Sequence, residues 1–235
     1  MAKYLFSLAL IVAFSFSHAQ NDRIAQPDIP GDLLLDIGIN YWTNDRDTLG
    51  NWGSRSIGIY YNRRLPINDH FAFYPAVGLT FERFSFKEDA HYRNDGTGNI
   101  VIDTVSGNFS RNKVIVTYLD VPLELRYHPR RTSEGEGFFI GAGIIGGLEL
   151  GAKTKLRYDV NGERYREKLK GDFGMRNYRY GYVVRVGWRS FNFYFKNYLS
   201  NLYQGQQALV NRDLEPTGET MNPSVFTFGI NFTGF

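Results

Sequence analysis

The sequence predicts an all-β fold, an eight-stranded antiparallel transmembrane β-barrel of the outer-membrane type. Apolar and polar residues alternate with a period of two along most of the chain, which is the periodicity of half-buried strands. Short turns alternate with long polar connections, as they do in outer-membrane barrels. The polar side of the alternation carries charged residues mixed with glycine. We therefore expect this side to line a closed lumen and the apolar side to face lipid.

The first residues predict export from the cytoplasm. Lys3 supplies a positive charge, and residues 4–16 form an apolar stretch of 13 residues. Ser17 and Ala19 place small residues at the −3 and −1 positions of a cleavage site, so we expect residues 1–19 to be a signal peptide. A transmembrane anchor is the alternative, but a spanning helix needs about 20 apolar residues.

Two segments follow the signal peptide. Residues 20–31 contain Pro27 and Pro30 and lack apolar periodicity, so we expect a periplasmic N-terminal tail. Residues 32–235 are expected to form the barrel, with no second domain. An even number of strands places both termini on one side, and the short turns on that side predict the periplasm.

The composition excludes several classes of site and partner. The chain has no cysteine, which excludes a disulfide framework, a thiolate metal site and a lipid-modified N-terminal cysteine. A net charge of +3 is too small to indicate a nucleic-acid partner, and no basic-aromatic nucleic-acid motif is present. We expect no cofactor and no metal.

The first three predicted strands cover residues 33–43, 55–67 and 71–87. Their apolar face carries Leu33, Leu35, Ile37, Ile39, Tyr41, Ile57, Ile59, Tyr61, Leu65, Phe73, Val77, Leu79 and Phe81. Their polar face carries Asp36, Gly38, Asn40, Ser56, Gly58, Tyr60, Asn62, Arg64, Ala76, Gly78, Thr80 and Glu82. Pro75 cannot donate a ladder hydrogen bond, so we predict a local bulge beside it.

The fourth and fifth predicted strands cover residues 114–127 and 138–152. In the fourth, the apolar face carries Leu119, Val121, Leu123, Leu125 and Tyr127, against Asp120, Glu124 and Arg126. In the fifth, one face carries Gly141, Gly143, Gly147 and Glu149. Glycine at these positions lets bulky side chains approach closely across a narrow lumen.

The last three predicted strands cover residues 178–189, residues from 191 onward, and residues 225–235. Their apolar face carries Tyr178, Tyr180, Tyr182, Val184, Val186, Trp188, Phe191, Phe193, Phe195, Phe226, Phe228, Ile230 and Phe232. Their polar face carries Arg179, Gly181, Val183, Arg185, Gly187, Arg189, Asn192, Tyr194, Lys196, Thr227, Gly229, Asn231 and Thr233. Gly234 interrupts the final alternation, so we expect an irregular end.

The third of the four long connections is the most distinctive. Long connections are expected at residues 44–54, 88–113, 153–175 and 203–222. Within the third, Val160-Asn161-Gly162-Glu163 predicts a type I′ turn in a hairpin over residues 156–169. We expect its basic residues to contact a partner protein or anionic lipopolysaccharide, or else to form a solvated ribbon. These basic residues are Lys153, Lys155, Arg157, Arg164, Arg166, Lys168 and Lys170.

A soluble lipocalin-like barrel is the main alternative for the same alternation. Strands of 11 to 15 residues exceed the usual soluble length of about five or six, and they suit a tilted crossing of a bilayer. An eight-stranded barrel is only wide enough for its own side chains, and buried charges must be paired. We therefore expect an ion-pair network in the lumen, formed by Glu82, Asp120, Glu124, Arg126, Glu149, Arg179, Arg185 and Lys196.

The predicted fourth strand also carries a motif. Residues 118–127 read Tyr-Leu-Asp-Val-Pro-Leu-Glu-Leu-Arg-Tyr, followed by the glycine-rich residues 138–143 and by Asn-Tyr-Leu-Ser-Asn-Leu at residues 197–202. This pattern resembles the PorT-like outer-membrane β-barrel family of Bacteroidetes. The resemblance implies an eight-stranded barrel in the outer membrane. It implies no single activity, although the founding member belongs to the type IX secretion machinery.

Three functions are considered from the sequence. The first is a non-enzymatic accessory or anchoring subunit of a larger envelope complex, in secretion, export or outer-membrane assembly. The second is a stand-alone barrel that acts as a narrow channel or binds at the surface. The third is a lipid-modifying enzyme at the rim, with His91 near Asp89, Asp95 and Ser85. The expected partners are outer-membrane lipid and lipopolysaccharide, the barrel-assembly machinery and envelope proteins.

Overall fold

The computed structural model describes residues 31–43, 53–85, 90–94, 100–104, 109–129, 137–160, 163–171, 173–205, 207–210 and 216–234. For residues 90–94, 100–104, 109–112, 156–160, 163–167, 169, 207–210 and 216–221, only the backbone is described. The predicted signal peptide and all but the last residue of the predicted tail lie outside these ranges.

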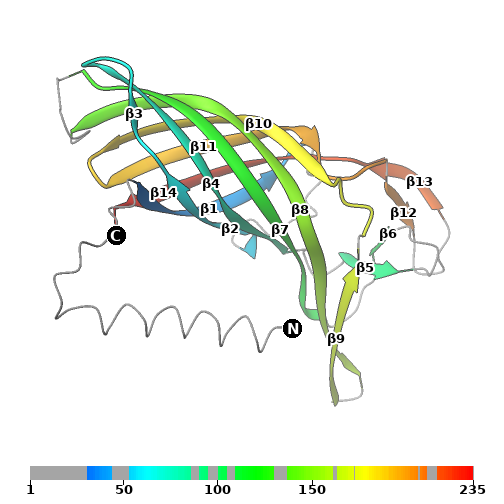
Figure 1. Cartoon of the computed structure of the whole chain (residues 1–235). Helices are drawn as coiled ribbons and strands as arrows, with labels where there is room; N and C mark the ends of the chain where they lie inside the picture. The colour runs from blue at the N-terminus through cyan, green and yellow to red at the C-terminus, as the bar shows by residue number, and fades with distance from the viewer. Residues whose placement is uncertain are drawn as a thin grey trace. The chain divides into compact units, whose positions relative to one another are not determined.

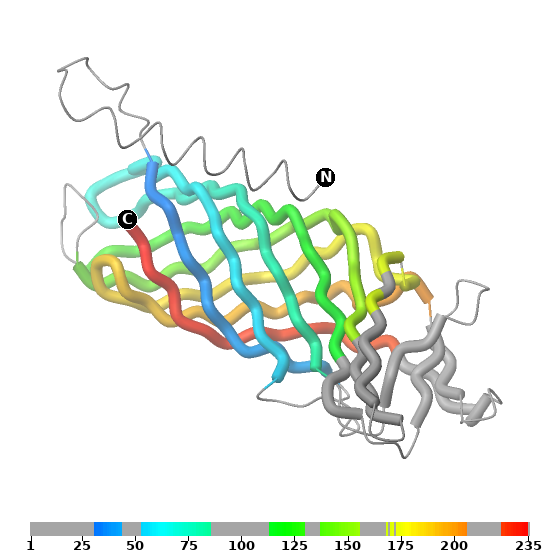
Figure 2. The backbone as a smooth tube through the Cα atoms, turned by 90° about the horizontal axis from the view of Figure 1, so that it is seen from below, coloured from blue at the N-terminus to red at the C-terminus, as the bar shows by residue number. Residues whose placement is uncertain are grey.

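Eight long strands close into an antiparallel barrel, which confirms the predicted fold class (Figure 1). They are β1 Asp32–Trp42, β2 Arg55–Asn62, β4 Phe71–Ser85, β7 Phe109–Tyr127, β8 Phe138–Val160, β10 Tyr178–Trp188, β11 Phe191–Asn201 and β14 Ser224–Thr233. Each pairs with its neighbour in the chain, and β1 pairs with β14 to complete the ring. Figure 2 shows this junction, where blue β1 lies beside red β14.

The two ends of the barrel differ in their connections. At one end lie the C-terminus and the turns after β3, β7 and β10, and the last of these holds only Arg189 and Ser190. The other end holds the strand ends that the four long connections join (Figure 2). Short turns at one end and long loops at the other are typical of barrels inserted in an outer membrane.

The alternation separates an exposed apolar face from a buried polar one. In β10 every second residue from Tyr178 to Val186 is exposed, and the residues between them are buried. The exposed apolar residues of β8 run from Phe138 to Leu150. Twelve steps of about 3.3 Å, tilted by about 45°, give a belt about 28 Å tall. This height matches the hydrocarbon core of a bilayer.

The expected strand over residues 55–67 is interrupted. Strand β2 ends at Asn62, and the short strand β3, Leu65–Pro66, pairs with β4 after a break at Arg63 and Arg64. The Arg63 amide donates a hydrogen bond to the Pro75 carbonyl oxygen at 3.1 Å, so the break remains tied to β4.

The predicted bulge at Pro75 is wrong. Pro75 pairs with Leu123, and Gly78 pairs with Asp120 in the same register, with no extra residue between them. The ladder between β4 and β7 skips the two intervening pairs, which include Pro122. Prolines lie on both strands and cannot donate ladder hydrogen bonds. The ladder therefore has a gap here, and no extra residue is inserted.

A bulge lies instead in β8, at Leu150 and Gly151. Thr117 pairs with Gly151 and Tyr118 pairs with Glu149, so Leu150 is the extra residue. Gly151 adopts a φ of 150°, a conformation that favours glycine. The insertion reverses the alternation of β8, so that beyond it odd-numbered residues such as Lys153 face outward.

Two long connections contain strands that the sequence analysis assigned to polar loops. Strands β5 Ala90–Asn94, β6 Ile100–Thr104, β12 Gln207–Val210 and β13 Pro216–Met221 form a second sheet in the order β13-β12-β6-β5. The link between the two connections is a parallel pairing of β12 with β6. This pairing joins segments about 100 residues apart, so local periodicity could not indicate it.

The predicted hairpin of the third connection is present. Strand β8 continues to Val160 and pairs with β9, Glu163–Gly171. The two residues of the turn itself, 161 and 162, lie outside the described residues. The described residues include no helix long and apolar enough to cross a membrane.

An arginine on the apolar belt tests which face meets lipid. Val184 lies near the middle of β10 and is 41% exposed. We expect Val184→Arg to lower the free energy of unfolding in lipid vesicles by about 2–4 kcal/mol, because a charge near the bilayer midplane is poorly solvated. Urea unfolding followed by tryptophan fluorescence measures the change.

The matched control is Ile67→Arg, because Ile67 is 62% exposed but lies in the turn before β4. We expect this substitution to change the unfolding free energy by less than about 1 kcal/mol. Equal effects of the two substitutions would contradict the assignment of the belt.

Candidate functional site

A charged cluster fills the middle of the lumen. Among the described residues, four buried carboxylates face four buried cations, so their formal charges sum to zero (−4 + 4). These residues are Asp36, Glu82, Asp120, Glu124, Arg126, Arg179, Arg185 and Lys196. Seven of them belong to the predicted network. Asp36 was assigned to the polar face but was left out of that network.

Asp36 is the centre of the larger part of this cluster. Arg185 binds it through both guanidinium nitrogens, with Nη1–Oδ1 and Nη2–Oδ2 distances of 3.1 Å. Lys196 Nζ lies 2.7 Å from Asp36 Oδ2, and Asn231 Nδ2 donates to Oδ1 at 2.6 Å. Strands β1, β10, β11 and β14 therefore meet at one carboxylate.

Glu124 extends this cluster toward β7 and β8. Its Oε1 accepts a hydrogen bond from Arg185 Nε at 2.9 Å, and its Oε2 accepts one from Arg126 Nη2 at 3.2 Å. The Arg126 guanidinium also lies over the rings of Tyr74 and Phe139, at 4.1 and 4.7 Å from their centroids. Arg126 is thus held both by the Glu124 carboxylate and by the faces of two aromatic rings.

Arg179 organises the second part of the cluster. It donates from Nε and Nη2 to the two oxygens of Asp120, at 3.0 and 2.6 Å, and its Nη1 lies 2.8 Å from Glu82 Oε1. The rings of Tyr118 and Tyr198 lie 3.6 and 4.1 Å from the guanidinium carbon. Planar stacking and bidentate pairing together favour arginine here over lysine.

A chain of hydroxyl groups joins the two parts. Lys196 Nζ donates to Tyr60 Oη at 2.9 Å, Tyr60 Oη lies 2.6 Å from Thr80 Oγ1, and Thr80 donates to Asp120 Oδ2 at 2.5 Å. Asp36 and Asp120 thus belong to one continuous network. Full pairing is what makes burial of eight charges tolerable, since an unpaired buried ion costs several kcal/mol.

Gly147 makes room for the second part. A Cβ atom at this position would overlap Asp120 Oδ1 and would lie 3.2 Å from Arg179. The glycine repeat of the predicted fifth strand therefore has a steric cause at this position. Gly147 lets the Arg179–Asp120 pair lie against the barrel wall.

An apolar layer closes the lumen at the long-loop end. Phe173 and Met175, from the connection before β10, are buried with side chains of the barrel strands. Met175 pairs with Tyr203 of the fourth connection through an isolated β-bridge. The other buried members include Trp42, Phe84, Val114, Val116, Ala152, Leu202 and Val225. Sequence reasoning missed this layer, because loop residues that fold inward have no periodicity.

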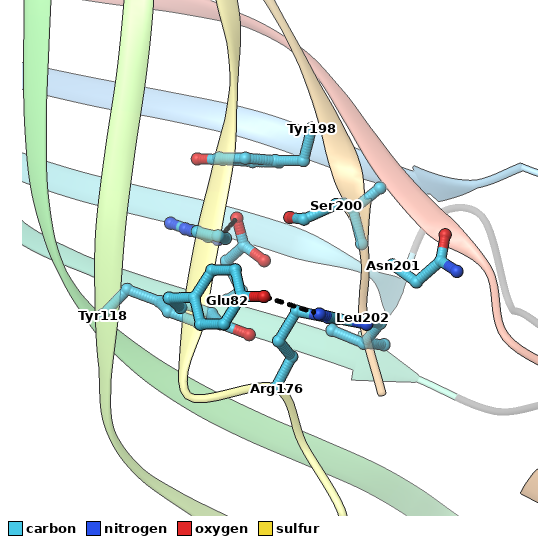
Figure 3. Close-up of a pocket in the computed structure, with 10 residues that line it drawn as sticks. Glu82, Tyr118, Arg176, Tyr198, Ser200, Asn201 and Leu202 are labelled. Atoms are coloured by element: carbon cyan, nitrogen blue, oxygen red, sulfur yellow. Dashed lines mark hydrogen bonds and ion pairs between the residues drawn. The ribbon is translucent and has the colours of Figure 1, made fainter. Parts of the chain in front are cut away.

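Little free space remains between the two layers. A cavity of about 10 Å³ lies between Glu82, Tyr118 and Tyr198, with Ser200 on its wall (Figure 3). This volume holds about one water molecule. Within the described part of the chain, this cavity is too small to hold a hydrated ion.

The opposite end of the lumen is an open vestibule. A cavity of about 460 Å³ is lined by Arg64, Arg126, His128 and Arg189, among others. The His128 side chain is buried, and neither ring nitrogen has a hydrogen-bond partner among the residues that the structure describes. Burial, together with the positive charges of Arg64 and Arg126, lowers the pKa of His128 below its ordinary value of 6.5.

Two residues of the predicted lumen face are not part of the buried cluster. Arg189 was assigned to the lumen face with Arg179 and Arg185, but it lies in the turn between β10 and β11 with a φ of 52°. The tight turn requires a positive φ, which takes Arg189 out of the strand alternation. Glu149 is only half-buried, because it adjoins the bulge at Leu150.

The predicted contact residues of the hairpin lie on β8 and β9. Lys153 pairs with Lys170, and Lys155 pairs with Lys168. Lys153, Lys168 and Lys170 are exposed, and Lys155 is half-buried. Arg157 pairs with Arg166, and Arg164 pairs with Asp159, but only their backbone is described.

The residues considered for catalysis are only partly described. His91 lies in β5 opposite Asp103, with its backbone alone described, and Asp89 and Asp95 lie outside the described residues. The Ser85 amide donates to Ser54 Oγ at 3.1 Å at the end of β4. Within the described part of the chain, no three His, Asp or Glu residues form a group able to hold a metal ion.

Residues 13–202 match a family model described as "Outer membrane protein beta-barrel domain". The match covers most of the chain. The protein belongs to this outer-membrane β-barrel family. The apolar belt is accordingly the surface that meets the lipid of the outer membrane, and the charged cluster is the interior of a membrane-embedded barrel.

Two solved structures match most of the chain at low sequence identity. Ail, the attachment invasion locus protein of Yersinia pestis, solved with the heparin analogue sucrose octasulfate, shares 10% identity with a TM-score of 0.34. That match covers 87% of this chain and 99% of Ail. The N-terminal β-barrel domain of Pseudomonas aeruginosa OprF shares 9% identity with a TM-score of 0.26, over 86% of this chain and 96% of that domain. No curated protein matches the sequence.

Loss of the central carboxylate tests the network. We expect Asp36→Asn to lower the free energy of unfolding by about 3–5 kcal/mol, because Arg185 and Lys196 would share one fewer buried negative charge. Urea unfolding in lipid vesicles measures this effect. Asp69→Asn, in the exposed turn before β4, is the control and should cost less than about 1 kcal/mol. An Asp36→Asn cost as small as that of the control would contradict the network.

The pH dependence of stability tests the vestibule histidine. Because the pKa of His128 is lowered on folding, the unfolded chain binds a proton more readily than the folded one. Stability from this group is present above pH 6.5 and is lost as the pH falls from 6.5 toward the lowered value. We expect His128→Asn to flatten the stability profile between about pH 5 and pH 7. An unchanged slope in urea unfolding would show that His128 does not contribute.

Proposed function

We propose that this protein is a non-enzymatic, closed outer-membrane barrel that serves as an anchoring or accessory subunit of a larger envelope complex. The observation that carries this proposal is the filled lumen. A charge-balanced network occupies its middle, and an apolar layer lies above it. A barrel whose interior is used for packing leaves its rims and loops to carry the function.

The long-loop end supplies the surface that such a subunit needs. Two connections combine into the four-stranded sheet of β5, β6, β12 and β13, and the β8–β9 hairpin extends beyond the barrel. Structured loops of this length in a compact domain are usually functional. In the proposed orientation these loops lie outside the cell and both termini lie in the periplasm, as short turns on the side of the termini favour.

The PorT-like resemblance of residues 118–127 supports one kind of complex. It favours a role beside secretion or export machinery over a free-standing barrel. A stand-alone surface-binding barrel would use the same loop sheet. A small-solute channel is disfavoured, since the central cavity holds about one water. A rim enzyme would require His91, and no neighbouring nucleophile is described around it.

Capture of partners from native membranes tests the proposal. The tagged mature protein is extracted in mild detergent, and the proteins that accompany it are quantified by mass spectrometry. The matched variant lacks residues 206–221, with Gly205 joined to Asn222 by a short turn. Strand β11 ends before this segment and β14 begins after it, so the barrel should keep its heat-modifiable migration.

We expect a stoichiometric set of envelope proteins with the full chain, reduced at least about fivefold with the shortened variant, because the loop sheet loses two strands. Recovery of the full-length barrel alone would count against a subunit role. An identical partner set with both proteins would reject the loop sheet as the docking surface.

A further inference from the structure

A block of four lysines occupies the outward face of β8 and β9. Lys153 stands directly opposite Lys170, and Lys155 stands directly opposite Lys168. Opposite residues lie about 5 Å apart across a ladder, and successive residues on one face lie about 7 Å apart along a strand. The four side chains therefore begin from a compact rectangle on one surface.

The two rows of this rectangle continue onto neighbouring strands. On one side of Lys155, Lys113 of β7 is its ladder partner. In the other row, Lys153 pairs with Ile115, which in turn pairs with Arg83 of β4. Arg83 pairs with Arg55 of β2, which completes the row. We call Arg55, Arg83, Lys113, Lys153, Lys155, Lys168 and Lys170 the basic collar.

By strand register, one acidic residue, Asp159, lies on the same face of the β8–β9 hairpin as the four lysines, opposite Arg164 and beyond Lys155. On the barrel strands that carry the collar, Glu82, Asp120 and Glu124 are buried in the lumen, and Glu149 is half-buried. Asp32 and Asp69 lie at the opposite end of the barrel. Like charges directly opposite each other destabilise a ladder, so an anion that bridges them would stabilise this surface.

The collar begins where the apolar belt ends. The next row along the strands toward the other end of the barrel runs through Ile37, Ile57, Phe81 and Thr117. Ile37, Ile57 and Phe81 are 41%, 46% and 40% exposed. A ligand at the collar therefore meets positive charge and lipid-facing surface within one residue spacing. Lysine and arginine stems can cover apolar surface while their heads stay at the polar interface.

We propose that the basic collar binds the phosphate groups of lipopolysaccharide in the outer leaflet, with the acyl chains of that lipid against the apolar belt. Adjacent charge and apolar surface favour an anionic glycolipid over an acidic protein, because a soluble protein would leave the belt side of the collar unused. Basic clusters at a membrane surface are the usual recognition element for anionic headgroups. The inference rests on the orientation proposed above, which places this rim in the outer leaflet.

A titration of the purified full-length protein in detergent tests this proposal. The probes are purified lipopolysaccharide and the same lipid after chemical removal of its phosphates, and native mass spectrometry counts the bound molecules. The test variant is K153Q/K155Q/K168Q/K170Q. The matched control is K153R/K155R/K168R/K170R, which keeps all four charges. Heat-modifiable migration verifies that each variant is folded.

We expect the glutamine variant to lose at least about tenfold in affinity for lipopolysaccharide, while the arginine variant stays within about threefold of the wild type. The wild type should bind the dephosphorylated lipid as weakly as the glutamine variant binds the intact one. Equal binding by the glutamine variant, or equal binding of the dephosphorylated lipid, would overturn the proposal. If the glutamine variant kept its lipid binding in the titration but lost an acidic envelope protein in the pull-down described above, the collar would be assigned to a protein partner. Because no envelope partner enters the titration, its failure is independent of the outcome of the pull-down.

Discussion

The pairing of buried charge inside a narrow barrel is the constraint on which the rest of this structure depends. Eight strands enclose a lumen that side chains must fill, and this chain fills it with four carboxylates and four cations. Asp36 binds Arg185, Lys196 and Asn231, so one carboxylate ties together strands from both ends of the chain. The bulky arginines and tyrosines are accommodated by small residues opposite them, such as Gly147. The outward face is then free to be apolar, as lipid requires.

Most of the barrel could be predicted from the sequence because its signal is local. Alternation over ten or more residues assigns each side chain to lipid or lumen, as in Tyr178 to Trp188, and no knowledge of the partner strand is needed. Three of the features that were missed depend on a partner segment. The bulge at Leu150 exists only relative to β7, and the pairing of β6 with β12 joins residues about 100 positions apart. The inward fold of Phe173 and Met175 depends on Tyr203 and on the barrel wall.

The residues of the site could be predicted from the sequence, but the contacts between them could not. Alternation alone places Asp120, Glu124, Arg179 and Arg185 in the lumen, because the period is strict in β7 and β10. It cannot say that Arg179 stacks between Tyr118 and Tyr198, or that Tyr60 and Thr80 connect the two parts. Arg189 shows where periodicity ends, since the backbone of a tight turn overrides the alternation. The sequence showed only the charged hairpin of the basic collar. The strand register of the structure adds Arg55, Arg83 and Lys113 to it.

The measurement that tests the central claim most directly is the conductance of the purified protein in a planar lipid bilayer. The paired charges and the apolar layer above them leave a central cavity of about 10 Å³, so we predict no steady single-channel current at moderate voltage and salt. Insertion is verified independently, by protease protection of the barrel in the same lipid. Regular, reproducible conductance steps from a folded and inserted protein would contradict a sealed lumen. They would favour a small-solute channel as the function of this protein.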